Sequence, residues 1–177
     1  MDFISRFEGL FGENLGSAVL GHLILNSQEI RDEFIGLLSD NSPVGPISYS
    51  SHFSSQTEYA TSSEGGSDED GRNNGRLDLL IQLDDVVIGI ENKFFAGFQP
   101  DQPGKYIPTL EHVAKTLGQI NRRTVRPILF ILCPEDRRGE AEVKANEHAG
   151  MVSVITWESV IRRFRSIRAA GRGATAS

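Results

Sequence analysis

Apolar residues recur at two different spacings along this chain, and each spacing predicts a different kind of element. In the first quarter they fall every three or four positions in two stretches, which is the spacing of amphipathic helices. The stretches are marked by Leu15, Val19 and Leu23, and by Ile30, Phe34, Leu37 and Leu38. The break between the two predicted helices lies near Asn26 and Ser27, and Asn26 with Glu29 is predicted to cap the second helix.

A second spacing, with short continuous or alternating apolar runs, predicts strands. Residues 79–83 and 86–91 are rich in aliphatic and β-branched side chains, and Asp84 with Asp85 separates them. Two such runs around a two-residue polar turn are typical of a β-hairpin. Residues 47–61 are serine-rich but alternate enough to predict one or two weak strands before it.

The second half of the chain alternates helix and strand signals. Buried strands are predicted at 127–133 and 151–156, and Thr156 is predicted to cap a last helix. A crossover helix before them is indicated by one apolar stripe, formed by Tyr106, Leu110, Val113 and Leu117. Pro108 would either kink this helix or delay its start. We therefore expect an α/β fold with a mixed sheet of four or five strands flanked by helices.

Length and charge narrow the classes of protein that fit. A chain of 177 residues is expected to form one domain, at 1–170, followed by a disordered tail at 171–177. The formal charge of −6 excludes a generally basic coat for nucleic acid, although a local basic face remains open. The acidic segment 62–74 is expected to be a solvated loop.

The sequence also indicates where the protein works. No secretory signal precedes the first predicted helix, and no apolar run approaches membrane-spanning length. The single cysteine, Cys133, lies in an apolar run and is expected to be a buried hydrophobe without a catalytic role. These features favour a reducing, cytoplasmic location.

Three charged residues at one end of the predicted hairpin are the most informative chemical feature. Asp78 would lie opposite the end of the second strand. There the side chains of Glu91 and Lys93 would point to one face of the sheet and that of Asn92 to the other, because side chains alternate along a strand. Charged groups at the end of an apolar strand are costly unless something pairs with them. A divalent cation is the natural partner of the two carboxylates. The alternative is a solvated hairpin carrying an ordinary Glu/Lys pair.

The spacing of these residues resembles that of the PD-(D/E)XK nuclease superfamily, which has an acid on one strand and (D/E)-x-K on the next. Within this superfamily, the motif is most similar to that of a bacterial branch with a GRxD…IENK…QxxxY pattern. The matching residues are Gly75, Arg76, Asp78, Ile90, Glu91, Asn92, Lys93, Ala96, Gln102 and Tyr106. Leu77 stands where the superfamily name has proline. The resemblance implies a restriction-endonuclease-like core.

The residues suggest roles that the resemblance also implies. Asp78 and Glu91 would each give one oxygen to Mg²⁺, with the backbone carbonyl of Asn92 as a third ligand and Mn²⁺ as a substitute ion. Lys93 would orient or deprotonate the attacking water and counter the charge of the transition state.

Further candidate site residues are identified mainly by the resemblance. Glu13 matches the branch's first glutamate and would complete the metal shell, although an acid in a first helical turn also suits the helix dipole. Ala18 stands where the branch often has another glutamate. Gln102 is the best match for a glutamine that contacts phosphate or the attacking water, and Gln99 is the second choice. Tyr106 is expected to belong to the core.

We expect Mg²⁺-dependent hydrolysis of a nucleic-acid backbone, with DNA as the favoured substrate and a role in bacterial defence or repair. The alternative is an inactive, nuclease-like module that binds nucleic acid or a protein partner, which the alanine at position 18 and the two prolines near the crossover helix would favour. Paired cuts would require a homodimer.

The last helix carries Arg162, Arg163, Arg165 and Arg168. This arginine face would either meet phosphates or be solvated.

Overall fold

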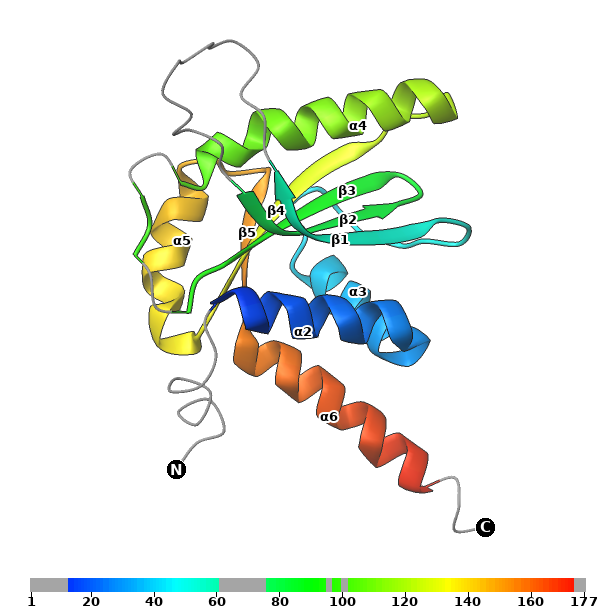
Figure 1. Ribbon diagram of the computed structural model, residues 1–177. Helices are drawn as coiled ribbons and strands as arrows, with labels where there is room; N and C mark the ends of the chain where they lie inside the picture. The colour runs from blue at the N-terminus through cyan, green and yellow to red at the C-terminus, as the bar shows by residue number, and fades with distance from the viewer. Residues whose placement is uncertain (1–12, 61–75, 95–96, 100–101, 174–177) are drawn as a thin grey trace.

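The predicted strands pair edge to edge, and the helices cover the two faces of the sheet that results (Figure 1). The computed structural model describes residues 13–60, 76–94, 97–99 and 102–173. The strands are β1 (Phe53–Ala60), β2 (Arg76–Leu83), β3 (Val86–Asn92), β4 (Arg126–Cys133) and β5 (Val152–Thr156). The helices are α2 (Glu13–Asn26), α3 (Gln28–Asp40), α4 (Ile107–Asn121), α5 (Arg138–Asn146) and α6 (Trp157–Gly173), with 3₁₀ turns η1 (Gly104–Tyr106) and η2 (Glu135–Arg137).

The five strands lie in the order β1-β2-β3-β4-β5. β1, β2 and β3 pair antiparallel, and the β2–β3 hairpin turns at residues 84–85. β3, β4 and β5 pair parallel, which requires the crossovers through α4 and α5. The mixed sheet flanked by helices confirms the predicted α/β class and is consistent with a restriction-endonuclease-like core.

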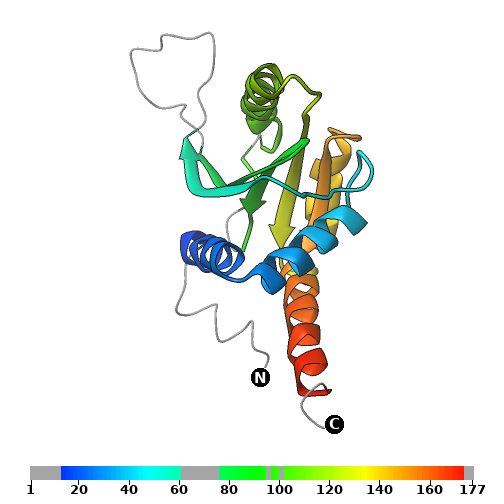
Figure 2. The same cartoon turned by 90° about the vertical axis from the view of Figure 1, so that its right-hand side faces the viewer.

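Helices lie on both sides of the sheet (Figure 2), and each face of the sheet has its own apolar core. Alternate residues of the strands pack against α2, α3 and α6 on one face, where Phe34, Phe130 and Val160 are buried. The opposite face packs against α4 and α5 through Leu110, Leu129 and Ala141. β3 lies in the middle of this arrangement, and all seven of its residues are buried. A charged residue at its end therefore enters an environment that is largely closed to water.

The structure corrects the predicted start of the second helix. Ser27, not Asn26, is the N-cap of α3, because its hydroxyl accepts a hydrogen bond from the backbone N–H of Ile30 at 3.3 Å. The side-chain amide of Asn26 instead donates to the carbonyl of His22, at 2.8 Å, inside the preceding helix. The break between the two helices lies where predicted, but Ser27 instead of Asn26 caps the second helix.

One helix was not predicted, and two predictions are refined. The second crossover helix, α5, was not predicted, because only Ala141 and Ala145 on it are buried and Val143 is exposed. Pro108 delays the start of α4: it lies in the first turn, after η1. α6 runs to Gly173, so residues 171–173 of the expected tail are helical.

The acidic segment predicted at 62–74 and the end of the tail at 174–177 lie outside the described residues. Within the described ranges, no helix combines the length and the apolar character needed to cross a membrane.

Candidate active site

The register of the hairpin brings the two predicted acids together. Leu79 of β2 pairs with Ile90 of β3, so the next positions outward, Asp78 and Glu91, face each other across the two strands. One oxygen of the Asp78 carboxylate also accepts a hydrogen bond from the backbone N–H of Asn92, at 2.7 Å. Asp78 is half-buried at this end of the sheet. The first acid therefore lies beside the Glu-x-Lys segment, as the hairpin predicts.

Glu91 and Lys93 form a buried ion pair. The Lys93 ammonium lies 2.8 Å from Glu91 Oε1, and the two side chains are only 7 % and 4 % exposed. They extend to the side of the sheet that α4 covers, whereas the Asn92 side chain extends to the opposite side, toward α2 and α6. The alternation predicted for this segment is confirmed. A solvated surface pair, the alternative interpretation, does not fit side chains this deeply buried.

Gln102 completes the contacts of Glu91. Its side-chain N–H groups lie 3.0 Å from Glu91 Oε1 and 2.8 Å from the Tyr106 hydroxyl. Gln102 precedes the turn η1, and the delayed start of α4 places it over the end of β3 instead of in a helix. Gln99, the second choice, accepts a hydrogen bond from Lys105 and its backbone N–H donates to Gln102. Tyr106 is a core residue as predicted, but its hydroxyl belongs to this polar cluster.

A glycine in β3 lets α4 pack closely on the strand that carries Glu91. A Cβ atom built on Gly89 would lie 3.0 and 3.1 Å from the two methyl carbons of Leu110 and 3.1 Å from Leu129 Cδ1. Sequence reasoning gave Gly89 no role. The available signal was an isolated glycine inside an apolar strand, which often marks a close approach of another element.

Burial dominates the electrostatics of the site. It raises the pKa of Glu91 from 4.5 to about 7; the Lys93 ammonium opposes this rise and the Asp78 carboxylate adds to it. The pKa of the Tyr106 hydroxyl is raised as well, by burial and by the nearby Glu91 carboxylate. A perturbed buried acid beside a second acid and a lysine is the kind of cluster that occurs at catalytic sites.

One buried oxygen of the site indicates that a cation fits there. Within the described residues, Glu91 Oε2 is buried and has no hydrogen-bond partner, whereas Oε1 receives both Lys93 and Gln102. A buried carboxylate oxygen without a partner is costly, and a hard cation shared with Asp78 would offset that cost. The described part of the chain holds no group of three or more His, Cys, Asp or Glu side chains suited to a metal. Glu13 begins α2, but its side chain lies outside the described residues.

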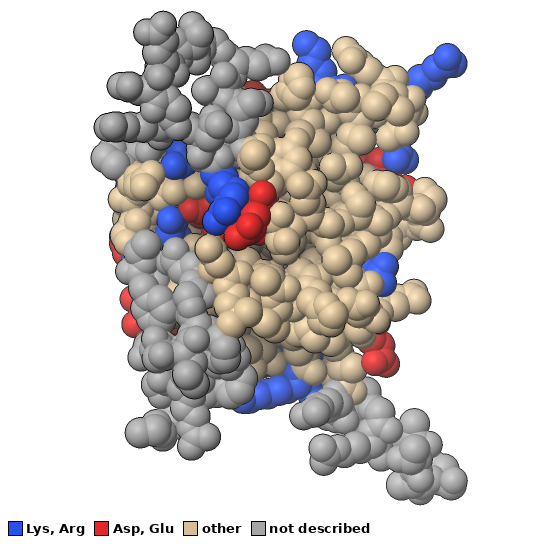
Figure 3. Space-filling view, in the orientation of Figure 1, with Lys and Arg blue, Asp and Glu red and all other residues tan. Residues whose placement is uncertain are grey.

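The predicted arginine face of α6 is partly neutralised. Arg163 forms ion pairs with Glu33, at 3.5 Å, and with Asp40, both on α3. Arg162 and Arg165 are exposed, and the Arg168 side chain lies outside the described residues. On the face of the molecule seen in Figure 3, basic and acidic side chains of the described residues are interspersed. A phosphate contact from Arg162 or Arg165 stays a prediction.

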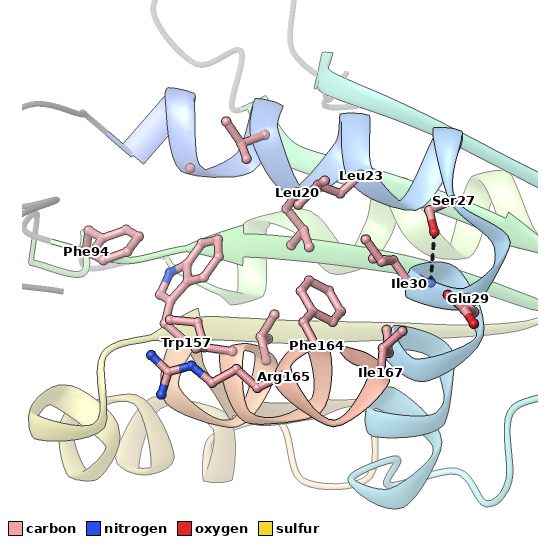
Figure 4. A pocket seen from close by; sticks show the side chains of 14 residues that line it. Leu20, Leu23, Ser27, Glu29, Ile30, Phe94, Trp157, Phe164, Arg165 and Ile167 are labelled. Carbon is pink, nitrogen blue, oxygen red and sulfur yellow. Dashed lines mark hydrogen bonds between the residues drawn. The ribbon is translucent and has the colours of Figure 1, made fainter. Parts of the chain in front are cut away.

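A groove of about 620 Å³ lies on the other side of the sheet, between α2, α3 and α6 (Figure 4). Its lining is mainly apolar and includes Leu20, Ile30 and Phe164, with Arg165 and Glu29 among its polar residues. Phe94 and Trp157 lie at one end of the groove, and their rings stack with centroids 5.1 Å apart. The groove approaches the hairpin end from the side opposite to Glu91 and Lys93.

Comparison with known proteins agrees with the motif and the fold. A family model described as the PD-(D/E)XK nuclease superfamily matches residues 18–174. No curated protein and no solved structure gave a significant match. Nucleases of this superfamily act on nucleic acids and generally use divalent metal ions. Because the match spans most of the chain and includes the hairpin with its two acids and lysine, this protein belongs to the PD-(D/E)XK nuclease superfamily.

Proposed function

We propose that this protein is a Mg²⁺-dependent nuclease that hydrolyses phosphodiester bonds, with DNA as its substrate. The observation that supports this most directly is the buried end of the hairpin. There, two facing carboxylates, a lysine 2.8 Å from one of them and a carboxylate oxygen without a partner in the described residues converge. Burying these charged groups costs free energy that apolar residues at the same positions would avoid, so the presence of the charged cluster favours a chemical role.

The proposed roles follow from these positions. Asp78, Glu91 and the backbone carbonyl of Asn92 would hold the metal ion, with Glu13 as a further ligand. The ion would supply charge neutralisation at the scissile phosphate and lower the pKa of a bound water. Lys93 would orient or deprotonate the attacking water and balance negative charge. Gln102, which donates to Glu91 Oε1, would hold that carboxylate in its orientation.

Lys93→Met tests the mechanism. Methionine approximates the length of lysine without its charge, which limits the cavity that alanine would leave at this buried position. Loss of a general-base or charge-balancing group should reduce the cleavage rate by at least about 100-fold. Rates would be measured on plasmid, linear duplex, single-stranded DNA and RNA, with and without Mn²⁺. Lys115→Met, on the exposed side of α4, is the matched control and should cut like the parent. Equal cutting by Lys93→Met and the parent would exclude the mechanism.

A module without catalytic activity is the second candidate, and the alanine at position 18 favours it, because the branch often has a glutamate there. Calorimetric titration with Mn²⁺ separates the two functions. The nuclease should take up the ion in a manner that depends on Asp78 and Glu91, whereas a docking module need not. The remaining parts of the proposal are a cytoplasmic role in bacterial defence or repair and, for paired cuts, a homodimer.

A further inference from the structure

Asn92 lies between the two charged residues of the Glu-x-Lys segment, and its side chain is anchored from the other side of the sheet. The Asn92 residue is 1 % exposed. Its Oδ1 accepts a hydrogen bond from the indole N–H of Trp157 on α6, at 3.0 Å, and its Nδ2 donates to the Ser17 hydroxyl on α2, at 3.2 Å. Two helices that are distant in sequence thus hold one amide.

The packing around this amide leaves little room for movement. A Cβ atom built on Gly16 would lie 3.3 Å from Asn92 Nδ2, 3.3 Å from Phe94 Cε2 and 3.4 Å from Trp157 Cζ2. The first two distances are shorter than ordinary van der Waals contacts, so a side chain at position 16 would require its neighbours to shift by a few tenths of an ångström, and glycine lets α2 pack this closely. Phe94 stacks on the Trp157 ring at the end of the groove, which fixes the indole that donates to Asn92 (Figure 4).

Stability alone does not explain an amide at this position. Ile88 and Ile90 precede Asn92 on the same face of β3 and are buried in the apolar core. A third aliphatic residue would continue that face without requiring two hydrogen-bond partners, since a buried amide is favourable only when its polar atoms are satisfied. The chain instead supplies Trp157 and Ser17 as those partners.

The backbone of the same residue holds the site. The N–H of Asn92 donates to Asp78 Oδ2 at 2.7 Å, and the next N–H, of Lys93, donates to the carbonyl of Leu132 at 2.8 Å. We propose that Asn92 is a positioning residue: Ser17 and Trp157, acting through its side chain, keep its backbone N–H aligned on the Asp78 carboxylate. This inference rests on the proposed function of Asp78 as a metal ligand.

Trp157→Phe provides the main test, because phenylalanine keeps an aromatic ring beside Phe94 and removes the indole N–H, together with part of the bicyclic ring that the Ser17 variants below leave intact. We expect the Kd for Mn²⁺, measured by calorimetry, to rise by about 10-fold or more, as is typical when a group that orients a metal ligand is lost. We also expect hydrogen exchange of the Asn92 amide, followed by NMR without metal, to become about tenfold faster. Ser17→Ala should shift both in the same direction, and Ser17→Thr, which keeps the hydroxyl, should restore them.

Phe164→Leu is the control for a purely structural effect, since it lies on α6 in the same groove and has no hydrogen bond to Asn92. It should lower thermal stability without changing the Kd or the exchange of the Asn92 amide. Unchanged exchange of that amide in folded Trp157→Phe and Ser17→Ala would overturn the inference. If the parent chain neither binds Mn²⁺ nor cuts, the proposed function fails, and the exchange rates still decide whether the anchor positions Asn92.

Discussion

At the scale of single residues, the central feature of the site is the Glu91 carboxyl group and the unequal contacts of its two oxygens. Glu91 gives Oε1 to both Lys93 and Gln102 and keeps Oε2 without a partner in the described residues. The cost of this burial appears as a pKa raised to about 7. Near neutral pH the group therefore lies between its acid form and the carboxylate that would bind a cation.

The raised pKa of Glu91 predicts a specific dependence of stability on pH. Between pH 4.5 and about 7 the folded chain holds a proton on Glu91 that the unfolded chain has lost, so the Glu91 contribution to the free energy of unfolding falls as pH rises through this interval. The full change is on the order of 3 kcal/mol. Urea denaturation with a chelator present, from pH 4.5 to 8, measures it.

Glu91→Gln is the comparison for this measurement. Glutamine resembles the protonated form of Glu91 that the folded chain holds at low pH, and it has no carboxyl group to titrate as the pH rises. The unfolding free energy of the parent minus that of the variant should therefore fall with increasing pH up to about 7, by the amount that the Glu91 titration contributes. Parallel curves for the two proteins would contradict the buried, protonated state of Glu91.

At the scale of elements, Gln102 lies just before the turn that leads into α4, and α4 packs on β3. The turn η1 ends at Tyr106 and α4 starts at Ile107, with Pro108 in its first turn. The Tyr106 hydroxyl and Gln102 are linked by a hydrogen bond, and Leu110 packs against Gly89 one turn further along. The apolar contact between Leu110 of α4 and Gly89 of β3 thus lies next to the polar cluster of Glu91, Gln102 and Tyr106.

Gly89→Ala tests this contact. The added methyl group would lie 3.0–3.1 Å from the methyl carbons of Leu110 and Leu129, so these side chains must move by a few tenths of an ångström in a packed core, and we expect a loss of about 1–3 kcal/mol in the free energy of unfolding. Gly36→Ala on α3 is the matched control, because a Cβ there has no neighbouring atom within 4 Å. It should stabilise the helix by up to about 1 kcal/mol. Both values come from urea denaturation, and equal effects of the two substitutions would argue against close packing at Gly89.

At the scale of the whole molecule, the sheet separates two environments that meet at the end of β3. One face carries Glu91, Lys93 and Gln102 under α4, and the other carries Asn92 with its partners on α2 and α6. The match to the superfamily spans all of these elements apart from the first residues of α2. Binding of a metal ion at the hairpin end should therefore stabilise the domain as a unit.

Thermal and urea unfolding with Mn²⁺ measure that linkage. At a free Mn²⁺ concentration 100 times its Kd, the free energy of unfolding should rise by about 2.7 kcal/mol, because the ion binds the folded chain preferentially. Asp78→Asn should abolish the increase. Asp85→Asn, at the opposite end of the hairpin where the carboxylate pairs with Arg126, should retain it. An equal response of Asp78→Asn and the parent would place the ion elsewhere.

The sequence by itself determined the hairpin, its turn and the convergence of Asp78, Glu91 and Lys93, because strand alternation and a two-residue turn are local properties. It also predicted the later strands, whose apolar runs are short and continuous. It did not predict α5, whose buried side is made of two alanines, or the capping role of Ser27, since Asn26 and Ser27 are both common caps.

Tertiary structure alone decided the environment of those residues. The Glu91–Lys93 pair is buried on the side of β3 that α4 covers, Gln102 reaches Glu91 from the segment before η1, and the space left by Gly89 admits Leu110 of α4. The anchor of Asn92 joins residues 75 and 65 positions away in the chain. No local pattern encodes contacts across such separations, because they arise only when the helices pack on both faces of the sheet.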